Sequence, residues 1–186
     1  LNALALWDLW RREGPATGWL HFVSIEKHPL RREDAARGFA AWPSLAALSA
    51  QLLAQWPSAL KGAHRLIFPQ DRFTITLFQD EAEQALGQIE ARVDAWFLDG
   101  FAPDRNEAMW SQPVLDRIGE LSRPGTRVAT FTVAGAVRRG LQQAGFSVEK
   151  RPGFGRKRQR LEAVHAGGMA VPVSSPVERT QPRAGR

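Results

Sequence analysis

Two residue types are missing from this sequence of 186 residues, which contains no cysteine and no tyrosine. Without cysteine the chain forms no disulfide, zinc ribbon or iron–sulfur site, and it has no cysteine nucleophile. The lack of cysteine suits a reducing compartment, so we expect a cytoplasmic protein. The four histidines are scattered along the chain without the spacing of metal ligands, and no metal site is predicted.

Long apolar runs are also missing. No stretch approaches the roughly 18 consecutive apolar residues of a membrane helix, and the start of the chain lacks the basic and apolar segments of a signal peptide. None of the serines lies in a Gly-x-Ser-x-Gly motif, so the sequence does not support a function as a hydrolase. The chain begins at Leu1 inside an expected helix, with no capping residue and no strand before it. We therefore expect a fragment of a longer protein, cut upstream.

The composition that is present is that of an ordinary globular protein with a basic excess. The chain is 44% hydrophobic and 24% charged, which excludes a wholly disordered protein, and its length suits one domain. Its 25 Lys and Arg residues exceed its 19 Asp and Glu residues, and the net charge of +6 favours an anionic partner. Part of the excess lies in a run without acidic residues, formed by Lys150, Arg151, Arg156, Lys157, Arg158 and Arg160.

Hydrophobic periodicity predicts helices that alternate with strands. We expect helices over 1–12, 30–42, 44–56, 80–89, 106–122 and 134–144. We expect strands over 19–25, 65–68, 73–78, 93–98, 127–132, 146–150 and 160–165, with the second and third forming a hairpin. This alternation favours an α/β fold with a parallel, doubly wound sheet. We expect one domain over 1–165, and the Gly-, Pro-, Ser- and Arg-rich segment 166–186 is interpreted as a linker or tail.

Acidic residues follow three of the predicted strands. Ligands of a doubly wound sheet bind beyond the carboxyl ends of its strands, which are followed here by Glu26, Asp80, Asp99 and Thr132. Carboxylates at such an edge can accept hydrogen bonds from the hydroxyl and amino groups of a nucleoside. The strand ends are therefore the candidate binding positions of this chain.

The first two carboxylates each have two interpretations. Glu26 either holds the two hydroxyl groups of a ribose or is a surface residue paired with Lys27 or Arg31. Asp80 either accepts a hydrogen bond from the exocyclic amine of a purine or caps the helix that begins near Glu81. Position alone leaves both alternatives open.

Asp99 lies in a more distinctive segment. It ends an apolar strand and is followed by Gly100, which permits unusual backbone angles, and by Pro103, which stiffens the loop. A helix with Asn106 as a possible N-cap follows. A carboxylate held above a sheet can orient an incoming amine and accept its proton. The alternative is a structural aspartate bonded to the amides of its own loop.

The segment Gly153–Gly155 contains a Gly-x-Gly core, but it is not a dinucleotide-binding motif. The basic residues Arg156, Lys157 and Arg158 follow it, and no helical pattern comes after them. We interpret this segment as a basic loop that contacts phosphate groups. The alternative is a basic loop exposed only to solvent.

Several longer motifs of the chain recur in the same order in one protein family. They are FVSIEKHPL at 22–30, VDAWFLDGFAP at 93–103, ATFT at 129–132, AVRRGLQQAGF at 136–146 and GFGRKR at 153–158. Together they resemble the methyltransferase domain of the tRNA 5-methylaminomethyl-2-thiouridine biosynthesis family, MnmC. The resemblance extends from Leu1 to about residue 163.

The resemblance implies a Rossmann-like fold and methyl transfer to tRNA. In this family S-adenosylmethionine gives its methyl group to the primary amine of 5-aminomethyl-2-thiouridine at the wobble position. An FAD-dependent oxidase forms the C-terminal domain of two-domain members, and it would lie beyond this chain, so FAD is not expected here. The family's Gly-x-Gly-x-Gly loop comes directly before the residues that match Leu1 and Asn2. We therefore expect the fold to lack its first strand, which would lie in the middle of the sheet.

The resemblance also implies roles for single residues. Glu26 would hold the ribose of the cofactor and Asp80 its adenine end, with Asn2 as a further cofactor contact. Asp99 would be the catalytic residue, in contact with both the amine and the cofactor. The anticodon arm of the tRNA and its base would be bound by Phe101, Arg138, Arg139, Arg156, Lys157 and Arg158. Two other functions stay open, namely a methyltransferase acting on another amine and a non-catalytic RNA-binding module.

Overall fold

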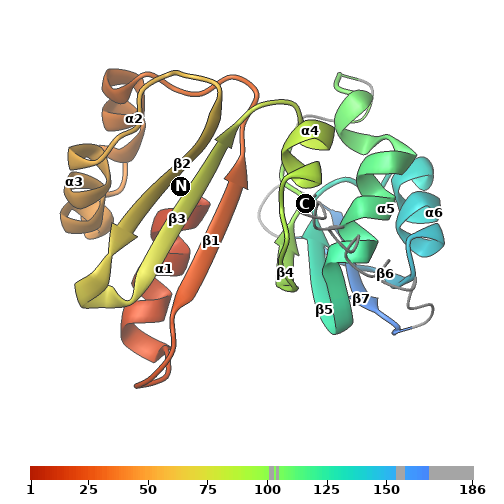
Figure 1. Ribbon diagram of the computed structural model, residues 1–186. Coiled ribbons are helices and arrows are strands. Elements are labelled where there is room, and N and C mark those ends of the chain that lie inside the picture. Colours follow the sequence, from red (N-terminus) through yellow and green to blue (C-terminus); the bar gives the residue numbers. More distant parts are fainter. Residues whose placement is uncertain (101–102, 104, 154–157, 168–186) are drawn as a thin grey trace, which may run out of the picture. The chain divides into compact units, whose positions relative to one another are not determined.

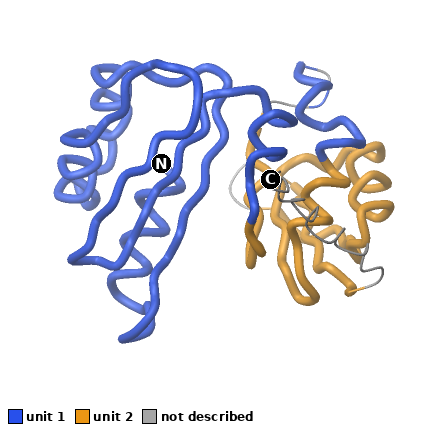
Figure 2. Tube along the Cα trace, viewed as in Figure 1, with its two compact units in different colours: residues 1–90, 103–114 blue, residues 91–102, 115–186 orange. Residues whose placement is uncertain are grey.

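The computed structural model describes residues 1–100, 103, 105–153 and 158–167 of the chain. The chain divides into two compact units, which are Leu1–Glu90 with Pro103–Val114 and Ala91–Ala102 with Leu115–Arg186 (Figure 2). Each unit has its own sheet. None of the described helices is long and apolar enough to cross a membrane.

The first unit contains a mixed sheet with the strand order β1-β3-β2 (Figure 1). β1 (Leu20–Ile25) is parallel to β3 (Phe73–Gln79), and β2 (Gly62–Phe68) is antiparallel to β3. The β2–β3 pair is the hairpin that the sequence predicts. The helices and 3₁₀ turns of this unit are α1 (Asn2–Glu13), α2 (Arg32–Phe39), η1 (Pro43–Leu45), α3 (Ala46–Ala54), η2 (Pro69–Asp71), α4 (Ala82–Gly87) and η3 (Ala108–Trp110).

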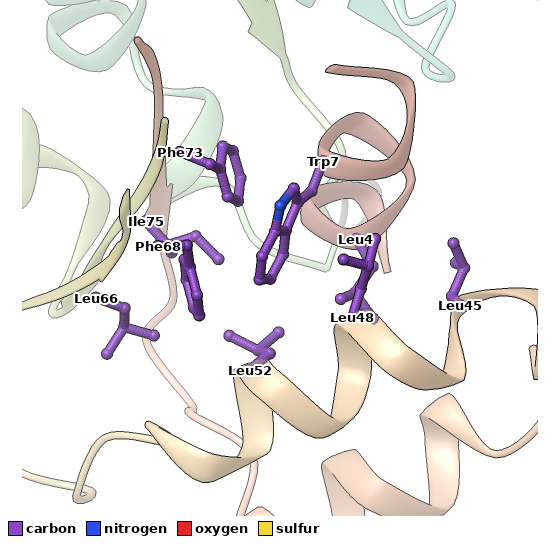
Figure 3. Packing of buried hydrophobic residues seen from close by; sticks show 9 residues of the cluster. All are labelled: Leu4, Trp7, Leu45, Leu48, Leu52, Leu66, Phe68, Phe73 and Ile75. Carbon is purple, nitrogen blue, oxygen red and sulfur yellow. The ribbon is translucent and has the colours of Figure 1, made fainter. Parts of the chain in front are cut away.

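Trp7 of α1 lies at the centre of the core of the first unit. Its side chain is fully buried, and its ring centroid lies 4.1 Å from that of Phe68 and 5.0 Å from that of Phe73. Figure 3 shows the indole pointing toward these strand residues, with leucines of α3 packed beside it. Its Nε1 donates a hydrogen bond of 2.8 Å to Asp71 Oδ2, which satisfies the polar group of the buried indole. This packing joins α1 to the β2–β3 hairpin.

The second unit contains a sheet with the strand order β4-β5-β7-β6. β4 (Val93–Phe97) is parallel to β5 (Ser122–Thr130), whereas β7 (Gln159–His165) is antiparallel to both β5 and β6 (Phe146–Pro152). Two helices, α5 (Gln112–Leu121) and α6 (Gly135–Gln143), accompany this sheet (Figure 1).

Helices α5 and α6 meet at Gly119. A Cβ atom on Gly119 would lie 2.4 Å from the backbone oxygen of Ala144, so only glycine permits this approach. Leu115 of α5 and Leu141 of α6 are buried on the same side of the unit's core. Gly145 follows α6 with a φ of 91°, as expected for a glycine that ends a helix.

The expectation of a parallel sheet is wrong for the last two strands of the second unit. Parallel neighbours need a crossover connection of about a dozen residues or more, and the segment 153–158 between β6 and β7 is too short for one. These two strands therefore form an antiparallel pair, and β7 returns antiparallel to β5 as well. The α/β character and the parallel pairs β1–β3 and β4–β5 are confirmed.

Several element boundaries also differ from the expectation, among them those of α5 and β5. The helix expected over 106–122 is divided into η3 and α5, with Ser111 extended between them. Pro113 lies in the first turn of α5, and because it has no N–H the helix cannot continue into it from upstream. β5 begins at Ser122, earlier than expected, because the hydroxyl of Thr126 donates to the oxygen of Val93 across a bulge in the β4–β5 pair.

Candidate cofactor and substrate site

The carboxyl end of the first sheet brings together two of the predicted residues. β1 and β3 are parallel and in register, with Ile25 opposite Phe78. The pairing continues one residue further, since the amide of Glu26 donates to the oxygen of Phe78 over 2.9 Å. Glu26 and Asp80 therefore follow neighbouring parallel strands at the same edge of the sheet, as the sequence predicts.

Glu26 is exposed at this edge, and one of its oxygens is anchored by its own loop. Its Oε1 accepts a hydrogen bond of 3.0 Å from the amide of His28. The alternative is a surface residue paired with Lys27 or Arg31. Glu26 does lie at the surface, but Lys27 Nζ lies 2.5 Å from Glu81 Oε1 instead, and no ion pair between Glu26 and Arg31 is found among the described residues. An ionised carboxylate has about four lone-pair sites, so the bond to His28 leaves acceptor capacity for the hydroxyl groups of a ribose.

Asp80 is more enclosed, with 15% of its side chain exposed. Its Oδ1 accepts hydrogen bonds from Lys61 Nζ and from the amide of Glu81, both at 2.9 Å. The hydrogen bond from Lys61, followed by that from Glu81, lowers the pKa of Asp80 below its ordinary value. The N-cap of α4 is Glu81 and not Asp80, but the bond from the Glu81 amide does tie Asp80 to the start of that helix, so the alternative of a helix-capping role is borne out in part.

The carboxyl end of the second sheet carries the other strand-end residues. Phe97 of β4 is opposite Ala129 of β5, and the amide of Leu98 donates to the oxygen of Ala129 over 3.0 Å. Asp99 follows this pair and is exposed. Thr132, at the end of β5, accepts a 3.3 Å bond from the Ala134 amide and so forms the turn into α6.

Three candidate residues for tRNA are described, and all of them are exposed. Arg138 and Arg139 lie on α6, and Arg158 lies where the β6–β7 hairpin closes, its oxygen accepting a 3.0 Å bond from the amide of Gly153. Asn2 is exposed in the first turn of α1. The remaining candidates, Phe101, Arg156 and Lys157, lie outside the described residues.

The basic run is partly neutralised by the fold. Arg151 Nη2 lies 2.7 Å from Glu149, and Arg160 Nη2 lies 2.5 Å from Glu162. The register of β6 with β7 places Glu149 opposite Glu162 and Arg151 opposite Arg160, so the acids come from positions just outside the run. The run contains no acidic residue in the sequence, but in the fold two of its arginines pair with glutamates. Fewer of its positive charges are therefore left to bind an anionic partner.

Sequence reasoning missed Lys61 beside Asp80 and two exposed apolar side chains near the ends of β4 and β5. Phe97 and Phe131 are 55% and 49% exposed, although phenylalanine in a strand is usually buried. The signal for Lys61 was present in the expected hairpin, because counting outward from Phe68 opposite Phe73 leads to Lys61 opposite Asp80. Within the described residues, no three Asp, Glu or His side chains are placed to hold a metal ion.

Comparison with known proteins connects these edges to a family. Residues 43–166 match the family model described as S-adenosyl-L-methionine-dependent methyltransferase. The chain is 66% identical, over 181 residues, to the tRNA 5-methylaminomethyl-2-thiouridine biosynthesis bifunctional protein MnmC of Maricaulis maris (strain MCS10), a match that covers 95% of this chain and 31% of the relative. It is 53% identical over 167 residues to the protein of the same name from Caulobacter vibrioides, covering 90% of this chain and 28% of that relative.

The chain thus spans about 30% of the length of these curated relatives, 31% and 28% in the two cases. The crystal structure of MNMC2 from Aquifex aeolicus superposes with a TM-score of 0.69 at 23% identity, covering 91% of this chain and 52% of that chain, and so has the same fold. The family predicted from the motifs is confirmed. Because the family match extends over about two thirds of the sequence, the chain belongs to the S-adenosyl-L-methionine-dependent methyltransferases.

Proposed function

We propose that the chain transfers a methyl group from S-adenosylmethionine to the primary amine of 5-aminomethyl-2-thiouridine at the wobble position of tRNA. The observation that carries this proposal is the 66% identity to an MnmC protein over 95% of the chain. The carboxylates that follow β1, β3 and β4 support it. The oxidase of the bifunctional relatives would lie beyond this chain, and FAD would be bound there.

The donor and acceptor groups at the edge of the first sheet fit the adenosine part of the cofactor. Adenosine offers two ribose hydroxyls and an exocyclic amine, all of which donate hydrogen bonds. Glu26 and Asp80 each use one oxygen for a backbone amide of their own loop and keep capacity to accept from a ligand. Glu26 would hold the ribose and Asp80 the amine, with Asn2 as a further contact. Bound S-adenosylmethionine supplies a methyl group on a positively charged sulfur.

Asp99 would act on the tRNA amine. The nitrogen must be unprotonated when it forms its bond to the methyl carbon, and it must then lose a proton. Asp99 accepts a hydrogen bond from the amine, aligns its lone pair with the methyl group, and accepts the proton that is released. Its exposed position after β4 leaves it open to a substrate from solution.

The tRNA would be bound through its anticodon arm. Arg138 and Arg139 of α6 and Arg158 of the hairpin would contact phosphates, together with Arg156 and Lys157 of the same basic loop. Phe101 would contact the base, which has to leave its stack before its amine reaches Asp99 and the methyl group of the cofactor. The protein would act in the cytoplasm, with 1–165 as its methyltransferase domain and 166–186 as a linker.

The finer detail of the fold, an additional first strand, is supported by two free edges. β1 is one of the two outer strands of its sheet and is parallel to β3, and β4 is one of the two outer strands of the other sheet and is parallel to β5. An outer strand offers a row of backbone donors and acceptors to a further strand. A segment encoded upstream of Leu1 would pair with one of these outer strands, and a Gly-x-Gly-x-Gly loop after it would hold the methionine end of the cofactor.

The experiment that tests the proposed function is methyl transfer from labelled S-adenosylmethionine, catalysed by the full-length protein that contains this chain. The acceptor is tRNA that carries the free aminomethyl group, and the control is the same tRNA with the amine already methylated. We expect label in the first tRNA alone. Transfer to small amines without tRNA would indicate a methyltransferase of other specificity, and tRNA binding without transfer would indicate an RNA-binding module.

A further inference from the structure

Lys61 reaches Asp80 because of the register of the β2–β3 hairpin. Gly62 of β2 is opposite Gln79 of β3. Lys61 comes directly before Gly62 and Asp80 directly after Gln79, so these two residues are the next ones beyond this pair. Their ion pair joins Nζ to Oδ1 over 2.9 Å. The lysine side chain is 81% exposed whereas that of the aspartate is 15% exposed. A solvent-exposed lysine side chain therefore lies against a carboxylate that is largely enclosed.

The two oxygens of Asp80 have different surroundings as a result. Within the described part of the chain, both the Lys61 ammonium and the amide of Glu81 donate to Oδ1. Two donors on one oxygen fix the rotation of the carboxylate about its last bond, because turning it would break both hydrogen bonds. Oδ2 then keeps its lone pairs for a donor that comes from a ligand.

We propose that Lys61 is a positioning residue for the cofactor, which holds the Asp80 carboxylate so that Oδ2 accepts the exocyclic amine of adenine. This inference rests on the proposed function, in which Asp80 binds the adenine end. Lys61 acts through Asp80 and needs no contact with the cofactor itself.

The charges around Asp80 support this role. Lys61 is the cation that contacts it, whereas Lys27 is engaged by Glu81, 2.5 Å away, and the nearby Glu26 accepts from a backbone amide. The hydrogen bond from Lys61 is the largest cause that lowers the pKa of Asp80, and the hydrogen bond from the amide of Glu81 is the second largest. A lowered pKa keeps the acceptor ionised as the pH falls below the ordinary value of a carboxyl group, and loss of Lys61 moves the pKa back upward.

The test replaces Lys61 by Met, which removes the ammonium but keeps an unbranched side chain, and by Arg, which retains charge and donors. Lys27→Met is the matched control, because Lys27 lies at the same edge in an ion pair whose acid is not a proposed ligand. The readout is the dissociation constant of S-adenosylmethionine, measured by calorimetry in the full-length protein between about pH 8 and pH 4.

We expect Lys61→Met to weaken binding about two- to fivefold at neutral pH, the range of one exposed ion pair. The loss should grow as the pH falls, because the unprotected Asp80 is protonated at a higher pH than in the unchanged protein. Lys61→Arg should restore most of the affinity, and Lys27→Met should match the unchanged protein at every pH. Thermal unfolding of the variants identifies any that fail to fold.

Asp80→Asn separates the two proposals. If this variant binds the cofactor as well as the unchanged protein, the adenine role of Asp80 is wrong and the role of Lys61 falls with it. If Asp80→Asn weakens binding but Lys61→Met follows the affinity and pH profile of the unchanged protein, only the inference about Lys61 is overturned. Tighter binding by Lys61→Met would also overturn it, since that result means that the lysine competes with the cofactor.

Discussion

Asp80 and Asp99 are both strand-end aspartates, but they differ in their exposure. Asp80 has 15% of its side chain exposed and is bonded to Lys61 and to a backbone amide. Those bonds suit a residue that binds the same group in every turnover. Asp99 is exposed after β4 and is followed by a glycine. This position suits a carboxylate that meets a large substrate arriving from solution.

The role of Asp99 is tested by its replacement with Asn, which keeps the size and one acceptor oxygen but removes the charge. We expect methyl transfer to fall by about 10²–10⁴-fold, the usual contribution of a general base. Raising the pH should recover part of the rate, because more of the substrate amine is then unprotonated. The assay is single-turnover transfer of labelled methyl to tRNA by the full-length protein.

Calorimetry with the cofactor is the control for Asp99→Asn, and we expect nearly unchanged binding. Full activity of this variant at neutral pH would mean that Asp99 only supports its loop by accepting backbone amides, a role that asparagine can also fill.

At the scale of elements, the packing of α5 against the end of α6 depends on a single missing side chain. A Cβ on Gly119 would lie 2.4 Å from the backbone oxygen of Ala144, a distance that real Cβ atoms do not adopt. Because a backbone oxygen cannot rotate away as a side chain can, one helix would have to shift. Val137 and Leu141 of α6 are buried, so that shift would disturb the core of the second unit.

We therefore predict that Gly119→Ala lowers the free energy of unfolding by about 1–3 kcal/mol, the usual cost of overpacking a core. The matched control is Gly38→Ala in α2, where a Cβ would meet nothing within 4 Å. That change should raise stability by about 0.5–1 kcal/mol, since alanine favours a helix over glycine. Urea denaturation followed by circular dichroism gives both values, and equal stability of the two variants would contradict the steric argument.

At the scale of the whole molecule, two outer strands, β1 and β4, precede residues that are proposed to bind the cofactor or the substrate. Each of these strands has one neighbour in its sheet and is parallel to it. β1 is followed by Glu26 and β4 is followed by Asp99, the residues proposed to contact the cofactor and the substrate. A strand with one partner is held by half of the hydrogen bonds that an inner strand makes. The positions of these carboxylates are therefore less restrained than they would be beside inner strands.

We predict that residues 1–186 bind S-adenosylmethionine more weakly than a protein extended upstream of Leu1. The added segment would pair with one of these outer strands and supply the loop for the methionine end of the cofactor. Calorimetry on the two proteins side by side measures the difference. Equal affinities in the micromolar range would show that neither the additional strand nor its loop is needed for binding.

The sequence by itself determined the features that depend on neighbouring residues. Hydrophobic periodicity located the strands and most of the helices, because the alternation of buried side chains is a local property. The motifs identified the family, and the carboxylates after β1, β3 and β4 were visible as the residues that end apolar runs.

Only the tertiary structure decided which segments become neighbours. It made β6 and β7 antiparallel, and it placed Glu149 and Glu162 against Arg151 and Arg160, so that a run of basic residues lost part of its charge. It also joined Lys61 to Asp80. These pairings depend on strand direction and register, which are set by the balance of packing and hydrogen bonds between segments far apart in the chain, and a local pattern carries no record of that balance.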